Sequence, residues 1–175
     1  MSGHNKWSKI KNQKAVTDGQ KSKIFTKMVR LITVEAKKAQ GNVNAPGLAA
    51  AIVKARGENM PNENIERAIK KASSDPASME AITYEAYGPG GCAMVIDTLT
   101  DNRNKAAQEV KHILSLNGTE LAGIGAATWA FEKTHEGWIP KTMVTLNDED
   151  GAKLGALVDA LEENEEVQAV YTNAE

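Results

Sequence analysis

The side chains best suited to bind a charged ligand are the lysines and arginines near the start of the chain. Ten Lys and Arg lie between Lys6 and Lys38, against two acids, Asp18 and Glu35. Basic groups that neutralise phosphates release the condensed counterions of a nucleic acid, and this release drives binding without reading the base sequence. We therefore expect phosphate contacts from the following residues: Lys6, Lys9, Lys11, Lys14, Lys21, Lys23, Lys27 and Arg30.

Trp7 lies among the first lysines of this segment, and its indole could stack on an exposed base or sugar. It could equally pin the segment to the helices that follow. A run of charge is often no more than a solvated helix face, but the density and one-sidedness of this run favour nucleic-acid contact. We assign Trp7 as an anchor or a stacking group of the expected interface.

A second group of polar residues, 99–105, lies where a predicted strand enters a predicted helix. Helix N-termini attract anions, and Arg103 would add positive charge there. Asp101 and the neighbouring asparagines are also ordinary capping residues, and capping explains their types better than ligand binding does. Arg103 is therefore a secondary candidate contact, and Asp101 is the expected helix cap.

Residues that could carry out catalysis or hold a metal are scattered. The three histidines form no His-x-x-x-His pair, and the single Cys92 is expected to be a small buried hydrophobe of a strand. The turn at residues 88–91 lacks the Gly-Lys-Ser/Thr ending of a phosphate loop. The acidic runs 148–150 and 162–166 are best explained as solvated surface. We expect no enzyme, no catalytic residue, no cofactor and no metal.

The overall charge of the 175 residues hides a division. The chain has 21 Lys and Arg against 23 Asp and Glu, but residues 1–72 hold 15 against 5 and residues 73–175 hold 6 against 18. Such asymmetry is typical of a basic surface for nucleic acid or anionic membrane joined to an acidic body. No apolar run approaches the roughly 20 residues that cross a bilayer. We therefore expect no membrane partner. A single cysteine cannot form an internal disulfide, which is typical of a reducing compartment, so we expect a cytoplasmic protein.

The elements that must position the basic residues are helices. Residues 18–40 carry apolar side chains at helical spacing, with Lys21, Lys23, Lys27 and Arg30 on the opposite face. A shorter helix is expected from Leu48 to about residue 57, and a third from residue 61. No helix-turn-helix with its short turn is evident among them. The first third of the chain is predicted to be a small helical bundle.

Beyond residues 73–78 the periodicity changes from 3.6 to 2, which indicates a domain boundary. Strands are expected at residues 82–87, 92–97, 127–132, 142–146 and 167–171, with helices at 101–116 and from 148. This order predicts an antiparallel α+β sandwich lobe with helices on one face of the sheet. The predicted fold class is α+β, with a basic helical N-terminal domain at residues 1–74 and an acidic α+β domain at residues 75–175.

Five separated blocks of the sequence resemble the YebC/PmpR family, and the resemblance extends through a tail at residues 167–174. The blocks read SGHNKWSKIK at residues 2–11, KIFTK at 23–27, NMPNENIERAIKK at 59–71, YEAYGPGG at 84–91 and LTDNRN at 99–104. The resemblance implies a helical N-terminal domain followed by α+β lobes. It also implies a DNA-binding transcriptional regulator or a ribosome-associated translation factor, since similar mitochondrial proteins are translational activators.

The chain departs from the family pattern at one place. Typical members carry a third lobe between the segments that correspond to residues 129–132 and 140–144, whereas residues 133–139 alone span that gap here. The chain therefore resembles a two-lobe version of the family, with the third lobe absent around residues 133–140.

The sequence thus predicts a non-enzymatic, nucleic-acid-binding regulator of gene expression. The residue types do not separate DNA from ribosomal RNA or the ribosome as the target. The alternative is a protein-interaction adaptor without direct nucleic-acid contact, in which the acidic body docks on another protein.

Overall fold

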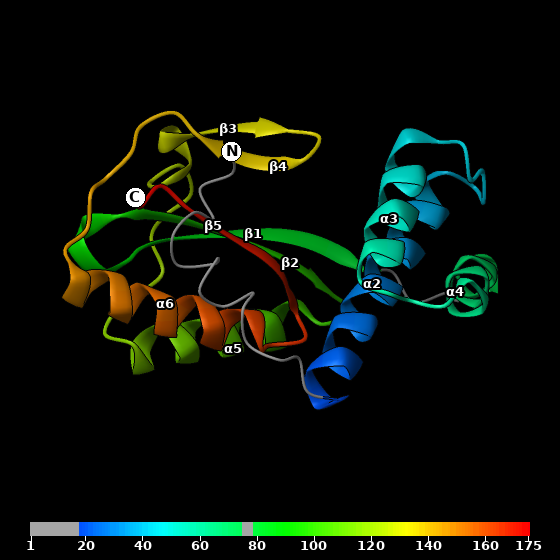
Figure 1. Ribbon diagram of the computed structural model, residues 1–175, viewed down its shortest axis with the longest axis horizontal. Coiled ribbons are helices and arrows are strands. Elements are labelled where there is room, and N and C mark those ends of the chain that lie inside the picture. Colours follow the sequence, from blue (N-terminus) through cyan, green and yellow to red (C-terminus); the bar gives the residue numbers. More distant parts are fainter. Residues whose placement is uncertain (1–17, 75–78) are drawn as a thin grey trace. The chain divides into compact units, whose positions relative to one another are not determined.

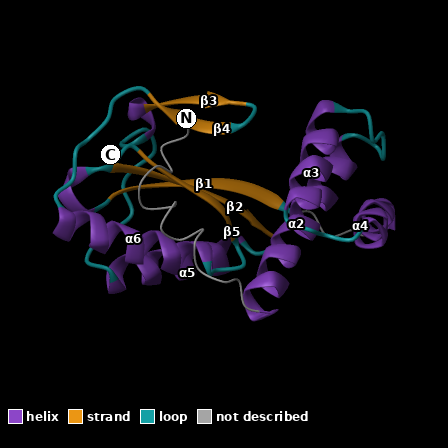
Figure 2. Ribbon diagram, viewed as in Figure 1, coloured by secondary structure: helices purple, strands orange, loops and turns teal. Residues whose placement is uncertain are grey.

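The computed structural model describes residues 18–74 and 79–175, and the chain divides into two compact units (Figure 1). The helical unit is Val16–Glu80, and the α+β unit contains Ala81–Glu175. Figure 2 shows the strands confined to the second unit, apart from the first residue of one strand. The domain boundary that the sequence predicts, between residues 74 and 75, borders residues 75–78, which lie outside the described ranges.

Within residues 18–74 the helical unit contains three helices, α2 (Asp18–Lys38), α3 (Pro46–Gly57) and α4 (Asn62–Ser74). The apolar residues of each helix recur every three to four positions and so form one stripe. The three stripes meet in one core: Met28, Ile32, Ala36, Leu48, Ala51, Ala55, Met60, Ile65, Ala68 and Ala72. The predicted helical bundle is confirmed.

The larger sheet of the α+β unit has the strand order β1-β2-β5, formed by β1 (Glu80–Tyr87), β2 (Ala93–Thr100) and β5 (Val167–Thr172). β2 and β5 are antiparallel, with Ile96 opposite Val170. The helices α5 (Arg103–Leu116) and α6 (Asp148–Glu162) lie along one face of this sheet in Figure 1. The α+β class is therefore confirmed.

Both faces of β2 are buried, which explains why its first four residues, 93–96, are all apolar. Met94 and Ile96 point into the core that α5 and α6 supply, whereas Ala93 and Val95 pack with Phe131 in a second core. The second core is formed by a hairpin of β3 (Phe131–Thr134) and β4 (Gly137–Pro140). A strand that is covered on both sides has no solvent-facing residues to alternate with.

Two predicted strands are wrong. Residues 128–130 of the strand expected at 127–132 form a short 3-10 turn, η2 (Thr128–Ala130), and β3 begins only at Phe131. The strand expected at 142–146 makes a single parallel bridge, between Val144 and Ala174, and the hairpin strand lies earlier, at β4. The expected single sheet is thus two sheets, because the hairpin pairs with itself and covers the larger sheet.

The connection between β1 and β2 is a tight turn, η1 (Pro89–Gly91), as the sequence predicts. Gly90 has φ 69° and Gly91 has φ 77°, so both need the left-handed region that glycine tolerates best. A Cβ at Gly90 would overlap the side chain of Leu146. Cys92 lies one residue before β2 and is fully buried, as expected for a small hydrophobe.

Candidate nucleic-acid interface

The predicted contacts of the first 17 residues lie outside the described ranges. They are Lys6, Trp7, Lys9, Lys11 and Lys14. Their proposed contact with nucleic acid stays a prediction from the sequence.

The predicted contacts on α2 do not share one environment. Lys21 and Lys23 are exposed, and the Lys21 Nζ lies 3.9 Å from a carboxylate oxygen of Asp18. Arg30 is half-buried, and Lys27 is only 8% exposed. The expectation that Lys27 lies on an outward face with the other cations of α2 is wrong, because its side chain is buried, as a long aliphatic stem can be. Lys21 and Lys23 are the predicted contacts of α2 that a phosphate can reach directly.

Seven further cations of the helical unit are exposed and were not predicted as contacts, among them Lys37 and Lys38 in the last turn of α2. Lys54 and Arg56 lie on α3, and Arg67, Lys70 and Lys71 lie on α4. They alternate with buried alanines and isoleucines, so the helical period that marks the core also marks these positions as outward-facing. The helical period in the sequence therefore indicates that these cations face outward. The acids in the same stretch lower its net positive charge, so a charge count does not single them out.

The connection between α3 and α4 is short and closely fixed. α3 ends at Gly57 and α4 begins at Asn62. Asn59, between them, has φ 61°, and the N–H of Met60 donates to the Ala55 carbonyl at 3.0 Å. A left-handed residue combined with this hydrogen bond is the Schellman arrangement that ends many helices. The short connection agrees with the expected helix bounds, near residue 57 for the end of one helix and at residue 61 for the start of the next.

The residue that occupies the left-handed position is Asn59 and not a glycine. Glycine is the usual signal for a helix end of this kind, and the sequence has Gly57 two residues too early. Asparagine tolerates the left-handed region less readily than glycine but better than most residues. Arg56 then donates from Nε to the Asn62 side-chain oxygen at 3.2 Å, which ties the two helices across the turn.

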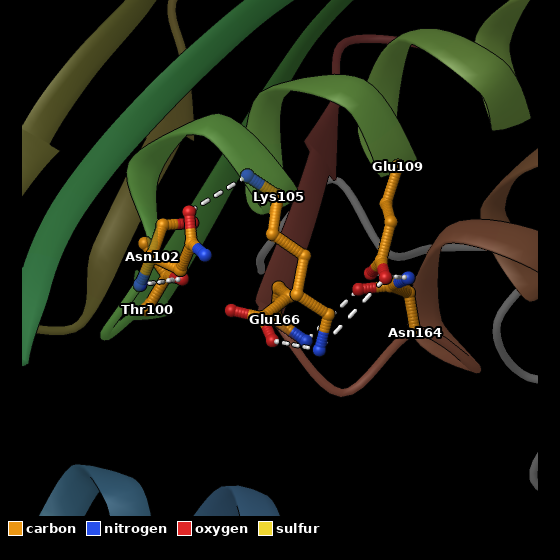
Figure 3. A network of polar contacts seen from close by, with 6 residues as sticks. All are labelled: Thr100, Asn102, Lys105, Glu109, Asn164 and Glu166. Atoms are coloured by element: carbon orange, nitrogen blue, oxygen red, sulfur yellow. Dashed lines mark hydrogen bonds and ion pairs between the residues drawn. The ribbon is translucent and has the colours of Figure 1, made fainter.

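In the α+β unit, the residues around Arg103 form a polar network at the start of α5 (Figure 3). Arg103 is exposed and is the first residue of α5. The helix cap is Asn102, whose side chain accepts from the Lys105 N–H at 3.1 Å, and not Asp101 as expected. Thr100 explains the difference, because its hydroxyl holds Asn102 through two hydrogen bonds of 2.9 Å.

Lys105 is exposed, and its ammonium is paired with a buried carboxylate. Its Nζ lies 3.2 Å from a carboxylate oxygen of Glu166, which is fully buried, as Figure 3 shows. Asn164 supports the same turn, since its side-chain oxygen accepts from the Glu166 N–H at 2.9 Å and its amide donates to Glu109. The expectation that the acidic run 162–166 is solvated surface is therefore wrong for Glu166. A buried carboxylate needs a partner, and Lys105 supplies the charge.

A second buried carboxylate, Glu85 on β1, holds the connection that follows α5. Its oxygens accept from the backbone N–H groups of Gly125, Ala127 and Thr128 at 2.7–2.9 Å. Burial raises the pKa of Glu85, but the hydrogen bonds from Gly125, Thr128 and Ala127 outweigh it and hold the pKa below its ordinary value of 4.5. The carboxylate therefore stays ionised and acts as an internal anchor for the connection.

The anchored connection presents apolar groups to solvent. Ile124 is fully exposed and Trp129 is 57% exposed. Trp129 donates from Nε1 to the Tyr87 hydroxyl at 2.9 Å, and that hydroxyl donates to the Ala126 carbonyl. The polar atoms of both rings are thus used within the unit, which leaves their apolar surface outward.

The described residues offer little for catalysis or metal binding. In residues 18–74 and 79–175, no three His, Cys, Asp or Glu side chains are grouped closely enough to hold a metal ion. Burial raises the pKa of Cys92 to about 11, which disfavours the thiolate that a nucleophile needs. Over the same ranges, no helix has both the length and the apolar character of a membrane span.

Two protein-family models match the chain. The model described as TACO1/YebC protein N-terminal domain matches residues 5–75. The model described as TACO1/YebC second and third domain matches residues 79–136 and 133–174. The break in the second match falls at the end of β3 and the turn that leads into β4.

Several similar bacterial proteins carry the name "Probable transcriptional regulatory protein". The one from Syntrophobacter fumaroxidans is 41% identical over 178 residues, which cover 100% of this chain and 72% of the relative. The one from Thermotoga petrophila is 48% identical over 147 residues, which cover 82% of this chain and 58% of the relative. The one from Desulfosudis oleivorans is 34% identical over 239 positions, which cover 99% of this chain and 96% of the relative.

A solved structure shares the fold. The crystal structure of a conserved hypothetical protein from Aquifex aeolicus matches with a TM-score of 0.81 and 28% sequence identity. The match covers 90% of this chain and 91% of that chain.

Proposed function

Because the chain belongs to the TACO1/YebC family, we propose that it is a regulator of gene expression that binds nucleic acid through its helical unit. The resemblance seen in the sequence is thereby confirmed at the level of the family. The name that the bacterial relatives carry supports a role in transcription regulation. The proposal contains no catalytic step.

The observation that carries the proposal is the separation of charge between the two units. Residues 18–74 hold 11 Lys and Arg against 5 Asp and Glu, whereas residues 81–175 hold 6 against 16. Exposed cations occur on all three described helices of the helical unit, among them Lys23, Lys54 and Lys70. A surface of this kind attracts the phosphates of a nucleic acid, while the acidic unit is repelled by them.

The α+β unit is proposed to be a shortened form of the corresponding part of the family. In the comparison with the Desulfosudis oleivorans protein, the 175 residues of this chain leave at least 64 of the 239 aligned positions to the relative alone. The hairpin of β3 and β4 lies where the family match is interrupted. This supports a two-lobe protein in which a two-residue turn replaces a third lobe around residues 133–140. The domains are proposed to be residues 1–74 and 75–175.

The proposal is tested by binding of the full chain to fluorescently labelled duplex DNA and to a structured RNA over a series of salt concentrations. The logarithm of the binding constant should fall linearly with the logarithm of the salt concentration, with a slope of about −0.9 for each phosphate neutralised on duplex DNA. A triple charge reversal, Lys23→Glu with Lys54→Glu and Lys70→Glu, should weaken binding and flatten the slope.

A matched control comes from the α+β unit. Lys111 is an exposed lysine of α5, so Lys111→Glu makes one of the same charge reversals outside the proposed surface, and it is compared with Lys23→Glu alone as well as with the triple variant. It should leave the salt dependence unchanged. Binding that is absent for both nucleic acids, or equal in the triple variant and the wild type, would contradict the proposal and favour the adaptor without nucleic-acid contact.

The class of nucleic acid in the cell is tested by crosslinking followed by sequencing of the bound DNA and RNA. Enrichment of genomic DNA fragments supports a transcriptional role, and enrichment of ribosomal RNA supports a translational one. A cytoplasmic location is part of the proposal, and its support is the single cysteine, which forms no internal disulfide.

A further inference from the structure

The arrangement of α3 and α4 indicates which class of nucleic acid the helical unit binds. We propose that α3, the four-residue turn 58–61 and α4 form a helix-turn-helix that places the exposed face of α4 in the major groove of duplex DNA. This inference rests on the proposed nucleic-acid binding and adds to it the kind of nucleic acid and the element that reads it. Such a motif consists of two helices that cross steeply and are joined by a turn of three or four residues.

The relative direction of the two helices fits this motif. Figure 1 looks nearly along the axis of α4, which is seen end-on, whereas α3 runs across the view within the same unit. α2 lies against both and supplies Met28, Ile32 and Ala36 to the core that they share. In DNA-binding domains of this type, one further helix commonly supports the pair from behind.

The turn is held rigid enough to keep the two helices at a fixed angle. Asn59 provides the left-handed residue, and the Asn59 N–H donates to the Arg56 carbonyl at 3.0 Å while the Met60 N–H donates to Ala55. Met60, in the turn itself, is 4% exposed and packs into the core of the unit. Arg56 and Asn62 are hydrogen-bonded across the turn. A recognition helix must be held in this way, because its side chains meet base edges only in one register.

The outward face of α4 carries side chains that can distinguish base pairs. Asn62, Glu63, Glu66, Arg67 and Lys70 are exposed and follow the helical period. Arginine and lysine pair with the acceptors of guanine, asparagine with adenine, and glutamate accepts from the amino group of cytosine. These residues begin at the N-terminal end of α4, which is the end that contacts bases in this motif.

The two glutamates on α4 argue against a purely electrostatic role for this face. Glu63 is paired with Arg67, with 2.8 Å between the Glu63 carboxylate and a guanidinium nitrogen. Carboxylates repel phosphates, whereas in the major groove a glutamate can accept from the amino group of cytosine. The remaining cations, Lys54 on α3 and Lys71 near the end of α4, are placed to contact phosphates beside the groove.

The test is selection of bound sequences from a pool of randomised duplex DNA by the full chain. We expect enrichment of a short sequence, and Arg67→Ala should lower affinity for it by roughly 5- to 150-fold while affinity for unselected DNA changes little. The matched control is Lys23→Ala on α2, which should weaken binding to selected and unselected duplexes by the same factor. Circular dichroism of both variants should match the wild type, because both side chains are exposed.

The outcomes separate this inference from the proposed function. Salt-dependent binding without an enriched sequence would overturn the helix-turn-helix but leave nucleic-acid binding intact. Equal or tighter binding to an A-form RNA duplex would do the same, because its deep and narrow major groove does not admit a helix. No binding to any nucleic acid would overturn both. An enriched sequence that Arg67→Ala still selects would assign readout to another element and overturn the inference.

Discussion

The anchoring of the connection 117–130 by Glu85 makes a prediction that the structure defines closely. Glu85→Gln keeps the size of the side chain and removes its charge. In the wild type, the carboxylate accepts from Gly125 through one oxygen and from Ala127 and Thr128 through the other. A glutamine amide has one oxygen and one NH2 group, so at least one backbone N–H must face another donor.

The magnitude follows from these contacts. Hydrogen bonds to a charged group contribute about 1.5–3 kcal/mol each, and a buried donor left without an acceptor costs about 1–3 kcal/mol. The new amide can place its oxygen toward either set of backbone N–H groups and so keeps part of these hydrogen bonds. We therefore expect Glu85→Gln to lower the free energy of opening the connection by about 2–4 kcal/mol. A change of 2 kcal/mol corresponds to roughly 30-fold faster exchange of the affected amides.

The assay is hydrogen exchange at the Gly125, Ala127 and Thr128 amides of the full chain. Glu85→Gln should accelerate exchange there and leave the amides of α2 unchanged. The control is Glu120→Gln, since Glu120 is an exposed carboxylate of the same connection and its loss should have no effect. Equal protection of the three amides in the wild type and Glu85→Gln would refute the reasoning, because the carboxylate would then not hold the connection.

The pH dependence has a definite sign. The pKa of Glu85 is lowered below 4.5 in the folded protein, so its stabilising contribution is fully present above about pH 4.5 and is lost as the pH falls through the folded value. In the wild type the opening free energy of the connection should therefore fall in acid. Glu85→Gln should not share this step, because its amide does not titrate.

Four further predictions concern stability and reactivity. Asn59→Ala should destabilise the helical unit by about 1–2 kcal/mol in urea unfolding, because φ 61° is costly for alanine, whereas Asn59→Gly should be neutral or stabilising. Gly137→Ala should destabilise the α+β unit, because φ is 119° and the new Cβ would overlap the ring of Tyr171. Gly155→Ala on α6, where nothing lies within 4 Å, should instead add about 0.5–1 kcal/mol. Cys92 should react with a maleimide only after unfolding, since it is buried and its pKa is raised to about 11; rapid labelling of the folded protein would contradict its placement.

Local sequence patterns predicted much of the fold. Apolar residues at helical spacing located α2, α3, α4, α5 and α6, and the alternating segments located β1, β2 and β5. The strand errors both concern the hairpin region. Residues 142–146 alternate as a strand does, yet Val144 finds one bridging partner in Ala174, while the short segment before them pairs as β4. Alternation shows that a segment can be extended and does not show which segment it will pair with.

The candidate site was predictable in outline and not in detail. Residue counts revealed the basic first part of the chain, and five sequence blocks revealed the resemblance to the family. They did not reveal that Lys27 is buried, that Glu166 is buried beside Lys105, or that Asn59 ends a helix in place of a glycine. Each of these features depends on the groups that surround the residue in the folded protein. A charge count contains no information about those groups.

The sequence by itself determined the division of charge, the positions of the helices and of β1, β2 and β5, and the family to which the chain belongs. Only the tertiary structure decided which polar residues face solvent and which hold the fold together. The physical reason is distance along the chain. Glu85 meets Gly125 across 40 positions, and Lys105 meets Glu166 across 61. Periodicity and capping act within a few residues, whereas burial and pairing of a charge are set by partners that folding brings together.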